Sequence, residues 1–586
     1  MVDMNLLHHL ICYQIYPRSF MDTNHDGVGD INGVIEKLDY LKYIGINAIW
    51  LSPVYQSPMV DNGYDISDYE AIAEEYGTIE DMKRLIAESH QRGMRIIMDL
   101  VINHTSTMHR WFQESKQDKL NPKRDWYIWR DPIQGKFPPN NWRSIFGGSA
   151  WEYEPETNQY YLHVFSKDQP DLNWENLEVR HAIYEMINRW IHLGVDGFRL
   201  DAITFLKKGD LSRDLPSQSD DGLASVTNAC LNQPGLLAML HDLKQNTFSR
   251  KNIFTVAEAP GVSHHDLPSY VGRNGVFDMI FEFDHVNMDL AEEGKWYPPN
   301  EWNLSDLKNI ISKSQKMAIE LGNSALFLEN HDLSRSVNKF FKGRYHGPLT
   351  AKLLATLLLT LYGTPFIYQG QEIGMTNISL PSIDSYDDIA TIDQYHNAIK
   401  DGYTSEEALQ LVRRFSRDNA RTPMQWNAKQ YAGFSDHPPW ISVNPNYQLI
   451  NVEDQLADHQ SVLHYYRQLI HLRGTNDVWL KGNYELILED NPSIYAFTRT
   501  LNDKMMIVIL NFTHHDVNCC IPEAVPFDGA KLLITSYSEA KNSQHRSLGL
   551  SPYEARVYEV SKISKNTKWG NRIDSSEQDY VDHLCR

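Results

Sequence analysis

The nine residues VDGFRLDAI (195–203) decide the fold class of this chain. They form an apolar run of strand character that follows a helical pattern and reaches an acidic residue, Asp201. Similar strand-like runs, separated by helical patterns, lie at 11–17, 46–53, 95–104, 253–259, 279–284, 325–332 and 364–370. Regular alternation of strands and helices indicates parallel β/α units. Eight such runs predict a (β/α)8 TIM barrel, an α/β fold whose chemistry gathers at the carboxyl ends of the strands.

Two stretches interrupt this alternation, and a third pattern follows it. Residues 105–174 are rich in Trp, Pro, Asn and Gly and are too many for a loop, so we expect a small inserted domain, the B domain, after strand three. The barrel then comprises 1–104 and 175–485, with a polar excursion at about 374–460. Residues 486–563 contain period-two runs such as KMMIVILNFT (504–513), which predict a C-terminal all-β sandwich. Residues 564–586 have the composition of a polar tail.

Charge and composition exclude several classes of partner. The formal net charge of −21 repels nucleic acid and anionic membrane surfaces. The sequence has no apolar run of about 18 residues and no basic stretch before an apolar segment at its start, so we expect neither a membrane span nor a signal peptide. Scattered cysteines without metal-ligand spacing indicate a reducing compartment: Cys12, Cys230, Cys519, Cys520 and Cys585. We therefore expect a cytoplasmic monomer or homodimer without an organic cofactor.

Carboxylates fall at the ends of three predicted strands: Asp201 in GFRLDA, Glu258 in TVAEAP and Asp332 in LENHD. The carboxyl ends of barrel strands converge on one cleft. Cleavage of an acetal needs two carboxylates, one to attack or to activate water and one to protonate the departing oxygen. A third carboxylate can bind hydroxyls or stabilise an oxocarbenium-like transition state. The three positions therefore predict glycoside hydrolysis.

The neighbours of these carboxylates suggest how the duties are divided. Arg199 lies two residues before Asp201, so on a strand the two side chains share a face and the guanidinium favours an ionised Asp201. Glu258 has no cation in its own strand, and a drier environment would raise its pKa and suit it to acid catalysis.

Several motifs carry a resemblance to a known family. VDGFRLDA (195–202), TVAEA (255–259), ENHD (329–332) and DLVINH (99–104) resemble the four signature regions of the α-amylase superfamily, glycoside hydrolase family 13. Five further stretches resemble the oligo-1,6-glucosidase and α-glucosidase branch of that family: YQIYPRSF, VDNGYDISDY, FGGSAW, PDLNWEN and RDNARTPMQW. The resemblance spans nearly the whole chain. It implies a retaining enzyme with Asp201 as nucleophile, Glu258 as acid/base and Asp332 as transition-state stabiliser.

The same resemblance implies a pocket for one glucose. The residues of this pocket would hydrogen-bond sugar hydroxyls, stack on the ring or flank the entrance: Asp61, Tyr64, His104, Phe146, Phe165, Arg199, His331 and Arg417. Asp61 and Arg417 would pair across a closed end, which favours exo-cleavage from a non-reducing end. Phe146 and Phe165 could equally be core residues of the inserted domain.

A second constellation follows the first strand. Asp22, Asn24, Asp26 and Asp30 alternate along a glycine-containing loop, and the carbonyl of Val28 completes an oxygen set suited to a hard divalent cation. The spacing resembles an EF-hand loop, but position twelve is Gly33 and no helix precedes it. In the relatives this loop binds calcium away from the active site, so we expect structural Ca²⁺. The alternative is an Asx-rich turn without metal.

The preferred linkage stays open. Ala202 follows the nucleophile, where relatives that prefer α-1,6 bonds usually have Val and smaller residues accompany α-1,4 preference. Pro260, after the acid/base, is the residue found in many α-1,6-active relatives. These two positions together favour an enzyme that is broad or tolerates α-1,4 bonds.

Three other functions are compatible with parts of the pattern. Sucrose isomerases carry an arginine-rich loop, roughly R-L-D-R, after the ENHD strand, whereas this chain has DLSRSVNKFFKGR (332–344). The motifs alone do not exclude a trehalose-6-phosphate hydrolase. Non-enzymatic transporter heavy chains need a membrane anchor and several have lost catalytic carboxylates, so this chain fits them poorly. A small gluco-oligosaccharide or disaccharide is the expected substrate.

Overall fold

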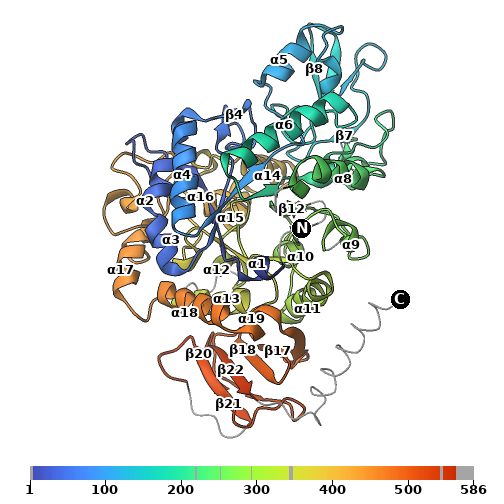
Figure 1. Cartoon of the computed structure of the whole chain (residues 1–586). Coiled ribbons are helices and arrows are strands. Elements are labelled where there is room, and N and C mark those ends of the chain that lie inside the picture. The colour runs from blue at the N-terminus through green and yellow to red at the C-terminus, as the bar shows by residue number, and fades with distance from the viewer. Residues whose placement is uncertain are drawn as a thin grey trace.

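Eight parallel strands close a barrel at the centre of the protein, as the sequence predicts (Figure 1). The computed structural model describes residues 4–561 except 218, 220, 251–252, 273, 292–293, 342–346 and 541–545. Around the barrel the order is β1 (Cys12–Ile15), β15 (Thr364–Tyr368), β14 (Ala325–Leu326), β13 (Met279–Phe281), β12 (Phe254–Glu258), β10 (Gly197–Leu200), β5 (Arg95–Leu100) and β2 (Ala48–Leu51). Each strand lies within one of the predicted runs, so the TIM-barrel prediction is confirmed.

Helices cover the outside of this barrel, which explains why its strands appear in the sequence as continuous apolar runs. Strands β2, β10 and β15 are buried at every position. Helix α4 (Ile79–Gln91) begins with a reciprocal capping box between Thr78 and Asp81 and turns Met82 and Leu85 inward. Helix α13 (Pro348–Thr360) is apolar all round and buried along most of its length, because it lies between the barrel and the C-terminal sheets.

The inserted segment forms a separate layer beyond the carboxyl ends of the barrel strands (Figure 1). Helix α5 (Arg110–Gln117) accompanies a three-stranded sheet of β6 (Trp129–Arg130), β9 (Gln159–Leu162) and β8 (Trp151–Glu154). One feature differs from the predicted range of 105–174: β7 (Trp142–Arg143) pairs with β11 (Ala224–Ser225), which follows β10. Phe205 and Val226 pack with Trp142 in one apolar cluster. A two-residue strand has no detectable period, so the sequence gives no signal for this partner.

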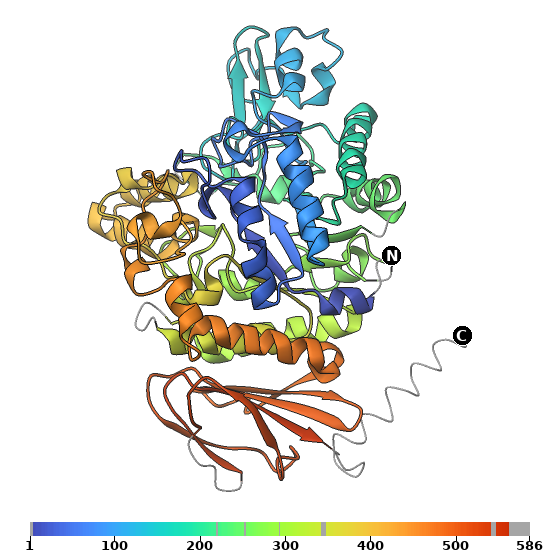
Figure 2. The same ribbon diagram turned by 60° about the vertical axis from the view of Figure 1, so that its left-hand side comes forward.

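Beneath the barrel lies the predicted sandwich (Figure 2). One sheet contains β16 (Asn483–Ile487), β17 (Ile494–Leu501), β18 (Lys504–Asn511), β22 (Ala555–Ser561) and β20 (Lys531–Thr535), and the other pairs β19 (Val517–Cys520) with β21 (Ser547–Leu550). Ile507 and Leu548 belong to the core that the two sheets share. The larger sheet also contacts α13, which joins it to the barrel. The predicted tail, 564–586, lies outside the described residues.

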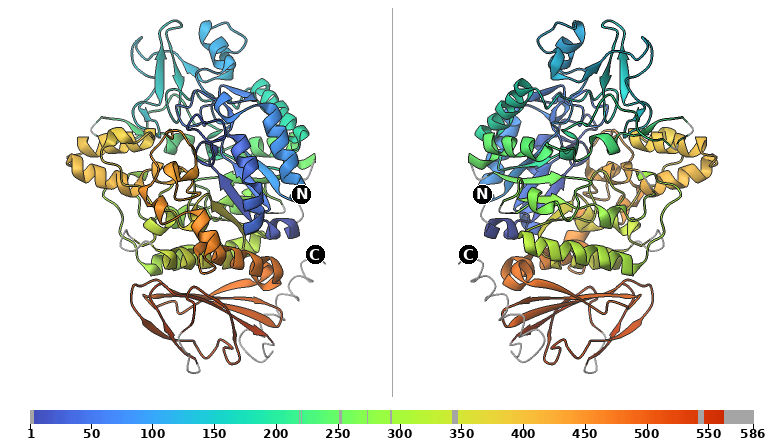
Figure 3. Two further views of the ribbon diagram at one scale, coloured as in Figure 1. Left: turned by 90° about the vertical axis from the view of Figure 1, so that its left-hand side faces the viewer. Right: turned by 90° about the vertical axis from the view of Figure 1, so that its right-hand side faces the viewer.

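The polar excursion extends from one side of the barrel (Figure 3). It contains the helices α14 (Ile389–Lys400), α15 (Ser405–Phe415) and α16 (Asp418–Arg421). Trp296 and Phe415 anchor it through a separate apolar cluster. Its α16 brings the RDNARTPMQW motif to the carboxyl ends of the strands. Among the described residues, no helix is both long and apolar enough to cross a membrane.

Candidate active site

One buried arginine connects the two carboxylates predicted to react. Arg199 is on β10, in register with Asp99 of β5, and Asp201 follows the end of the same strand. The Arg199 Nη1 atom lies 2.9 Å from Asp99 Oδ1 and 2.5 Å from Asp201 Oδ1. Its Nη2 atom lies 2.7 Å from Oε2 of Glu258, the last residue of β12. The strand register therefore places both carboxylates against a single guanidinium.

Burial and charge set the protonation of these groups. Burial raises the pKa of Asp201 to about 6, against the opposing charge of Arg199. Burial also raises the pKa of Glu258 to about 7, as expected, and here too Arg199 opposes the shift while the charge of Asp201 adds to it. The charge of Arg199 lowers the pKa of Asp201, and although burial outweighs it, a pKa of about 6 leaves Asp201 mostly ionised at neutral pH. Glu258 has no cation in its own strand and contacts Arg199 from the adjacent strand β10.

These pKa values predict a bell-shaped dependence of kcat/KM on pH. Activity should fall as the pH drops through about 6, because Asp201 must be ionised to attack. It should also fall as the pH rises through about 7, because Glu258 must be protonated to act as an acid. Glu258→Gln should remove the alkaline limb when an aryl glucoside with a good leaving group is the substrate. An alkaline limb that persists in this variant would contradict the assignment.

Asp332 lies in the loop after β14 and is held as an anion. Burial alone would raise the pKa of Asp332, but the contact with His331 and the charges of Arg417 and Arg421 outweigh it and hold the pKa well below its ordinary value. Nη1 of Arg417 and Nη2 of Arg421 approach the same oxygen, Oδ1, at 3.1 and 3.0 Å. With its side chain 30% exposed, this carboxylate remains accessible as a fixed negative charge.

The predicted sugar-binding residues converge on Tyr64. Its ring is stacked on that of His331, with centroids 5.2 Å apart and planes 5° from parallel. The Tyr64 hydroxyl lies 2.6 Å from His331 Nε2 and donates to Asp99 at 3.1 Å. On the other side, His104 Nε2 lies 3.0 Å from the Tyr64 carbonyl oxygen, and Gln169 donates to that oxygen at 3.2 Å. The histidines and the tyrosine thus form one hydrogen-bonded wall.

An ion-pair network lies beside this wall. Arg417 Nη2 lies 3.2 Å from Asp61 Oδ1, and Arg417 Nε donates to Asp388 at 2.7 Å. The Arg417 guanidinium is also 5.5 Å from the centre of the Phe146 ring, and Phe146 and Phe165 are neighbours at 5.9 Å. Both phenylalanines are partly exposed, so they lie at the edge of the site and not wholly in the core of the inserted segment.

Asp61→Ala should raise KM by about 10- to 100-fold, as expected for the loss of hydrogen bonds to a charged group. The effect of this substitution on thermal stability should be small, because Arg417 still forms ion pairs with Asp332 and Asp388. Steady-state kinetics on a disaccharide and a melting curve measure the two effects. Asp68→Ala, at the partly exposed first position of strand β4 (Asp68–Ile72), is the control. An unchanged KM would mean that the pocket is not closed at Asp61.

Sequence reasoning missed four residues of this network: Asp99, Gln169, Asp388 and Arg421. For two of them, Asp99 and Arg421, the sequence contains a feature that could have revealed the contact. Asp99 begins the DLVINH motif and pairs in register with Arg199, and Arg421 lies four residues after Arg417, one helical turn later in α16. Gln169 and Asp388 come from loop and helix-cap positions where no local pattern indicates their contacts.

The predicted calcium loop folds tightly on itself. Asp22 accepts hydrogen bonds from the backbone N–H groups of His25 and Gly27, at 2.8 and 2.9 Å, and Asp26 accepts one from Val28 at 2.8 Å. Asp30 caps the following helix, α2 (Ile31–Glu36). The oxygens of the three loop carboxylates do not all lie within 4.8 Å of one another. The donor types, carboxylate, amide and carbonyl oxygens, suit a hard cation. Both Asp26 oxygens accept a single hydrogen bond, whereas each Asp22 oxygen accepts two and would have to exchange one for the ion.

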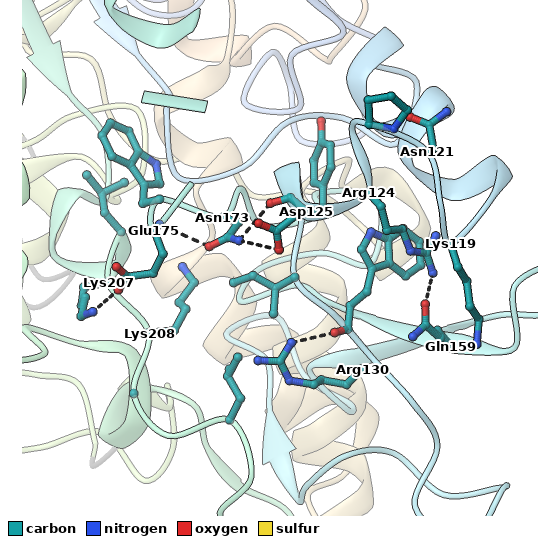
Figure 4. A pocket seen from close by; sticks show the side chains of 18 of the residues that line it. Lys119, Asn121, Arg124, Asp125, Arg130, Gln159, Asn173, Glu175, Lys207 and Lys208 are labelled. Carbon is teal, nitrogen blue, oxygen red and sulfur yellow. Dashed lines mark hydrogen bonds and ion pairs between the residues drawn. The ribbon is translucent and has the colours of Figure 1, made fainter. Parts of the chain in front are cut away.

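A separate cavity of about 830 Å³ opens between the inserted segment and residues 206–211 (Figure 4). Its charged side chains already have partners: Lys207 pairs with Glu175, and Asn173 donates to Asp125 at 3.2 Å. None of the three predicted catalytic carboxylates lines it. The candidate chemistry therefore belongs to the barrel mouth and not to this cavity.

Comparison with known proteins agrees with this geometry. Residues 14–482 match the family described as alpha amylase, catalytic domain. An oligo-1,6-glucosidase of Parageobacillus thermoglucosidasius is 46% identical over 552 residues, which cover 94% of this chain and 98% of that protein. The solved structure of trehalose-6-phosphate hydrolase from Bacillus licheniformis is 41% identical, with a TM-score of 0.87, and the match covers 95% of this chain and 99% of that one. Isomaltulose synthase SmuA from Protaminobacter rubrum, at 40% identity, has a TM-score of 0.89 over 95% of this chain and 99% of its own.

Proposed function

The chain belongs to the α-amylase family and is a glycoside hydrolase, and we propose that it is a retaining α-glucosidase that removes single glucose units from the non-reducing ends of short α-linked oligosaccharides. The observation that carries this proposal is the shared contact of Asp201 and Glu258 with Arg199. Retaining glycosidases need two carboxyl groups only about 5–5.5 Å apart, and carboxylates bound to one guanidinium lie close together.

Each group has a part in a double displacement. In the first step Asp201 Oδ bonds to the anomeric carbon while the glycosidic bond breaks and Glu258 gives its proton to the departing oxygen. In the second step Glu258 takes a proton from water, whose oxygen attacks the same carbon and releases Asp201. The anionic Asp332 would stabilise the positive charge that develops on the ring and would bind its hydroxyls.

The ion pairs of Arg417 with Asp61 and Asp388 support exo-cleavage. In the proposed pose these residues would close the pocket, and a chain would not continue past the terminal sugar. Tyr64 and His331 would form the wall beside that sugar, with Phe146 and Phe165 at its entrance.

The loop after β14 favours hydrolysis over sucrose isomerisation. Its first arginine, Arg335, is fully buried and forms an ion pair with Glu329 at 3.1 Å. It also donates to the carbonyl of Gln369 at 2.7 Å. Because the Arg335 guanidinium is buried and bound to these groups, it would not be free to contact an incoming fructose.

For the linkage we propose α-1,6 cleavage with tolerance of α-1,4 bonds, supported by the similar oligo-1,6-glucosidases and by Ala202. Ala202 is 5% exposed and has a left-handed backbone (φ 45°), and its N–H donates to Glu258 at 3.2 Å. A larger side chain here would fill space beside the acid/base.

A substrate panel tests this proposal: isomaltose, maltose, sucrose, trehalose and trehalose 6-phosphate, with the released anomer identified by NMR. We expect α-glucose, fastest from isomaltose. Ala202→Val should raise the isomaltose-to-maltose ratio of kcat/KM by about tenfold, as one added group in a pocket does. Ala202→Gly, which adds no bulk, should leave that ratio near the wild-type value. Exclusive turnover of trehalose 6-phosphate, or conversion of sucrose to an isomer, would overturn the proposal.

We also propose a structural Ca²⁺ in loop 22–30, held by Asp22, Asn24, Asp26, Asp30 and the carbonyl of Val28. The support is an oxygen-only donor set on a loop that is already tightly wrapped by its own hydrogen bonds. When bound, the ion would stabilise the loop; it would take no part in the reaction.

A cytoplasmic location is likewise a proposal. It is supported by four described cysteines that form no disulfide, Cys12, Cys230, Cys519 and Cys520. Fractionation of the producing cells, followed by an assay of each fraction, tests it.

A further inference from the structure

Three surface side chains outside the candidate active site bring metal-ligating atoms together. His25 and His437 each place Nδ1 at 2.8 Å from the same oxygen, Oδ1 of Asp436. The three ligand atoms all lie within 4.8 Å of one another, and in the described part of the chain no other three His, Cys, Asp or Glu side chains do so. All three side chains are more than half exposed, so an ion can reach them from solvent.

We propose that His25, Asp436 and His437 form a binding site for a divalent transition-metal ion of the zinc class. Two imidazole nitrogens and one carboxylate suit Zn²⁺, Ni²⁺ or Cu²⁺, whereas Ca²⁺ and Mg²⁺ prefer oxygen alone. Zinc–ligand bonds of about 2.0–2.2 Å put tetrahedral ligand atoms roughly 3.4 Å apart. The observed 2.8 Å contacts would need to open only slightly, and water would complete the coordination.

The backbone holds both sides of this site in place without the ion. His25 is in the centre of loop 22–30 and has φ 69°, a left-handed conformation that is uncommon for a residue with a side chain. The loop is fastened to segment 434–440 by two backbone hydrogen bonds of 3.0 Å, from Asp22 N to the Phe434 oxygen and from Trp440 N to the Gly27 oxygen. A preformed site pays less ordering entropy when it binds its ion.

The site differs from the proposed calcium loop although the two are adjacent. Calcium would use oxygens of residues 22–30, and neither imidazole nor Asp436 is among them. The surrounding charge favours any cation, because loop 22–30 carries three carboxylates on a chain of net charge −21.

A bound ion would act as a clamp. Segment 434–440 ends at Trp440, whose ring lies 4.1 Å from the Arg18 guanidinium and whose Nε1 donates to Ser19 at 3.0 Å. Both partners follow β1, so the ion would tie an exposed loop and a late segment to the first strand of the barrel. We therefore expect zinc to raise the melting temperature, by mass action on the folded state.

Isothermal titration of the untagged, chelator-treated full chain with ZnCl₂ tests the site. With saturating CaCl₂ present, the wild type should bind one equivalent of Zn²⁺ that His25→Ala and His437→Ala each weaken at least tenfold. His9→Ala, which removes an exposed imidazole elsewhere, should change nothing. Substitution of Co²⁺ should give visible d–d bands in the wild type and not in the double variant. The zinc-dependent rise in melting temperature should also disappear in that variant.

Zinc binding of unchanged affinity in the His25→Ala, His437→Ala double variant would overturn the proposal, as would displacement of zinc by calcium at equal concentration. The exposed positions make loss of folding unexpected, and Asp436→Asn, which keeps the side-chain shape, provides an independent variant. A calcium titration without zinc separates the two sites: calcium binding should be lost in Asp26→Ala and kept in His25→Ala.

Discussion

Asp201→Gly should lower hydrolysis of isomaltose by at least about 10⁴-fold, because loss of a nucleophile removes the covalent route altogether. Azide should then restore turnover of an aryl α-glucoside by entering the space that the carboxylate leaves. Attack by azide on the face opposite the leaving group must give a β-glucosyl azide. The anomer of this product therefore reports which face Asp201 occupies, and ¹H NMR measures it.

The companion variant Glu258→Ala should give the other anomer. Here Asp201 still forms the glycosyl-enzyme from an aryl glucoside, and azide attacks that intermediate to give an α-glucosyl azide. Two opposite anomers from two variants distinguish nucleophile from acid/base more sharply than loss of rate does. Asp503→Asn, an exposed carboxylate in the turn between β17 and β18, is the control and should retain full activity. The same anomer from both variants would contradict the division of labour.

Much of the fold was predictable because its strands are buried on both faces. Burial on both faces turns a strand such as β15 into an unbroken apolar run, and the helices between strands have cap signals such as Thr78 and Asp81. The β7–β11 pairing was not predictable, because it joins two-residue strands about 80 positions apart and rests on the packing of Phe205 and Val226.

The candidate site likewise has a predictable and an unpredictable part. Asp201 and Glu258 lie at strand ends, so their positions in the sequence place them at the mouth of the barrel. The contact between Arg199 and Glu258 joins the adjacent strands β10 and β12, so it follows only from the register of the barrel. Asp388 caps helix α14 in the polar excursion, and no local sequence pattern indicates where that excursion lies relative to the barrel. Its ion pair with Arg417 could therefore not be predicted from the sequence.

Arg199→Met should destabilise the protein by about 3–5 kcal/mol at neutral pH, because it leaves the carboxylates of Asp99, Asp201 and Glu258 buried without their common cation. Arg189→Met is the matched control. It breaks an exposed arginine–carboxylate pair with Glu70, which should cost no more than about 1 kcal/mol. Urea unfolding, followed by far-UV circular dichroism, measures both losses.

The pH dependence of this loss separates an electrostatic role for Arg199 from a packing role. In the wild type burial already raises the pKa of Asp99 and of Asp201 to about 6, and without Arg199 both must rise further. A native state that binds more protons than the unfolded state loses stability as the pH rises. The gap between variant and wild type should therefore be small near pH 5 and widen through pH 6 to 8. A gap that is constant across this range would mean that Arg199 fills space and that the carboxylates do not depend on its charge.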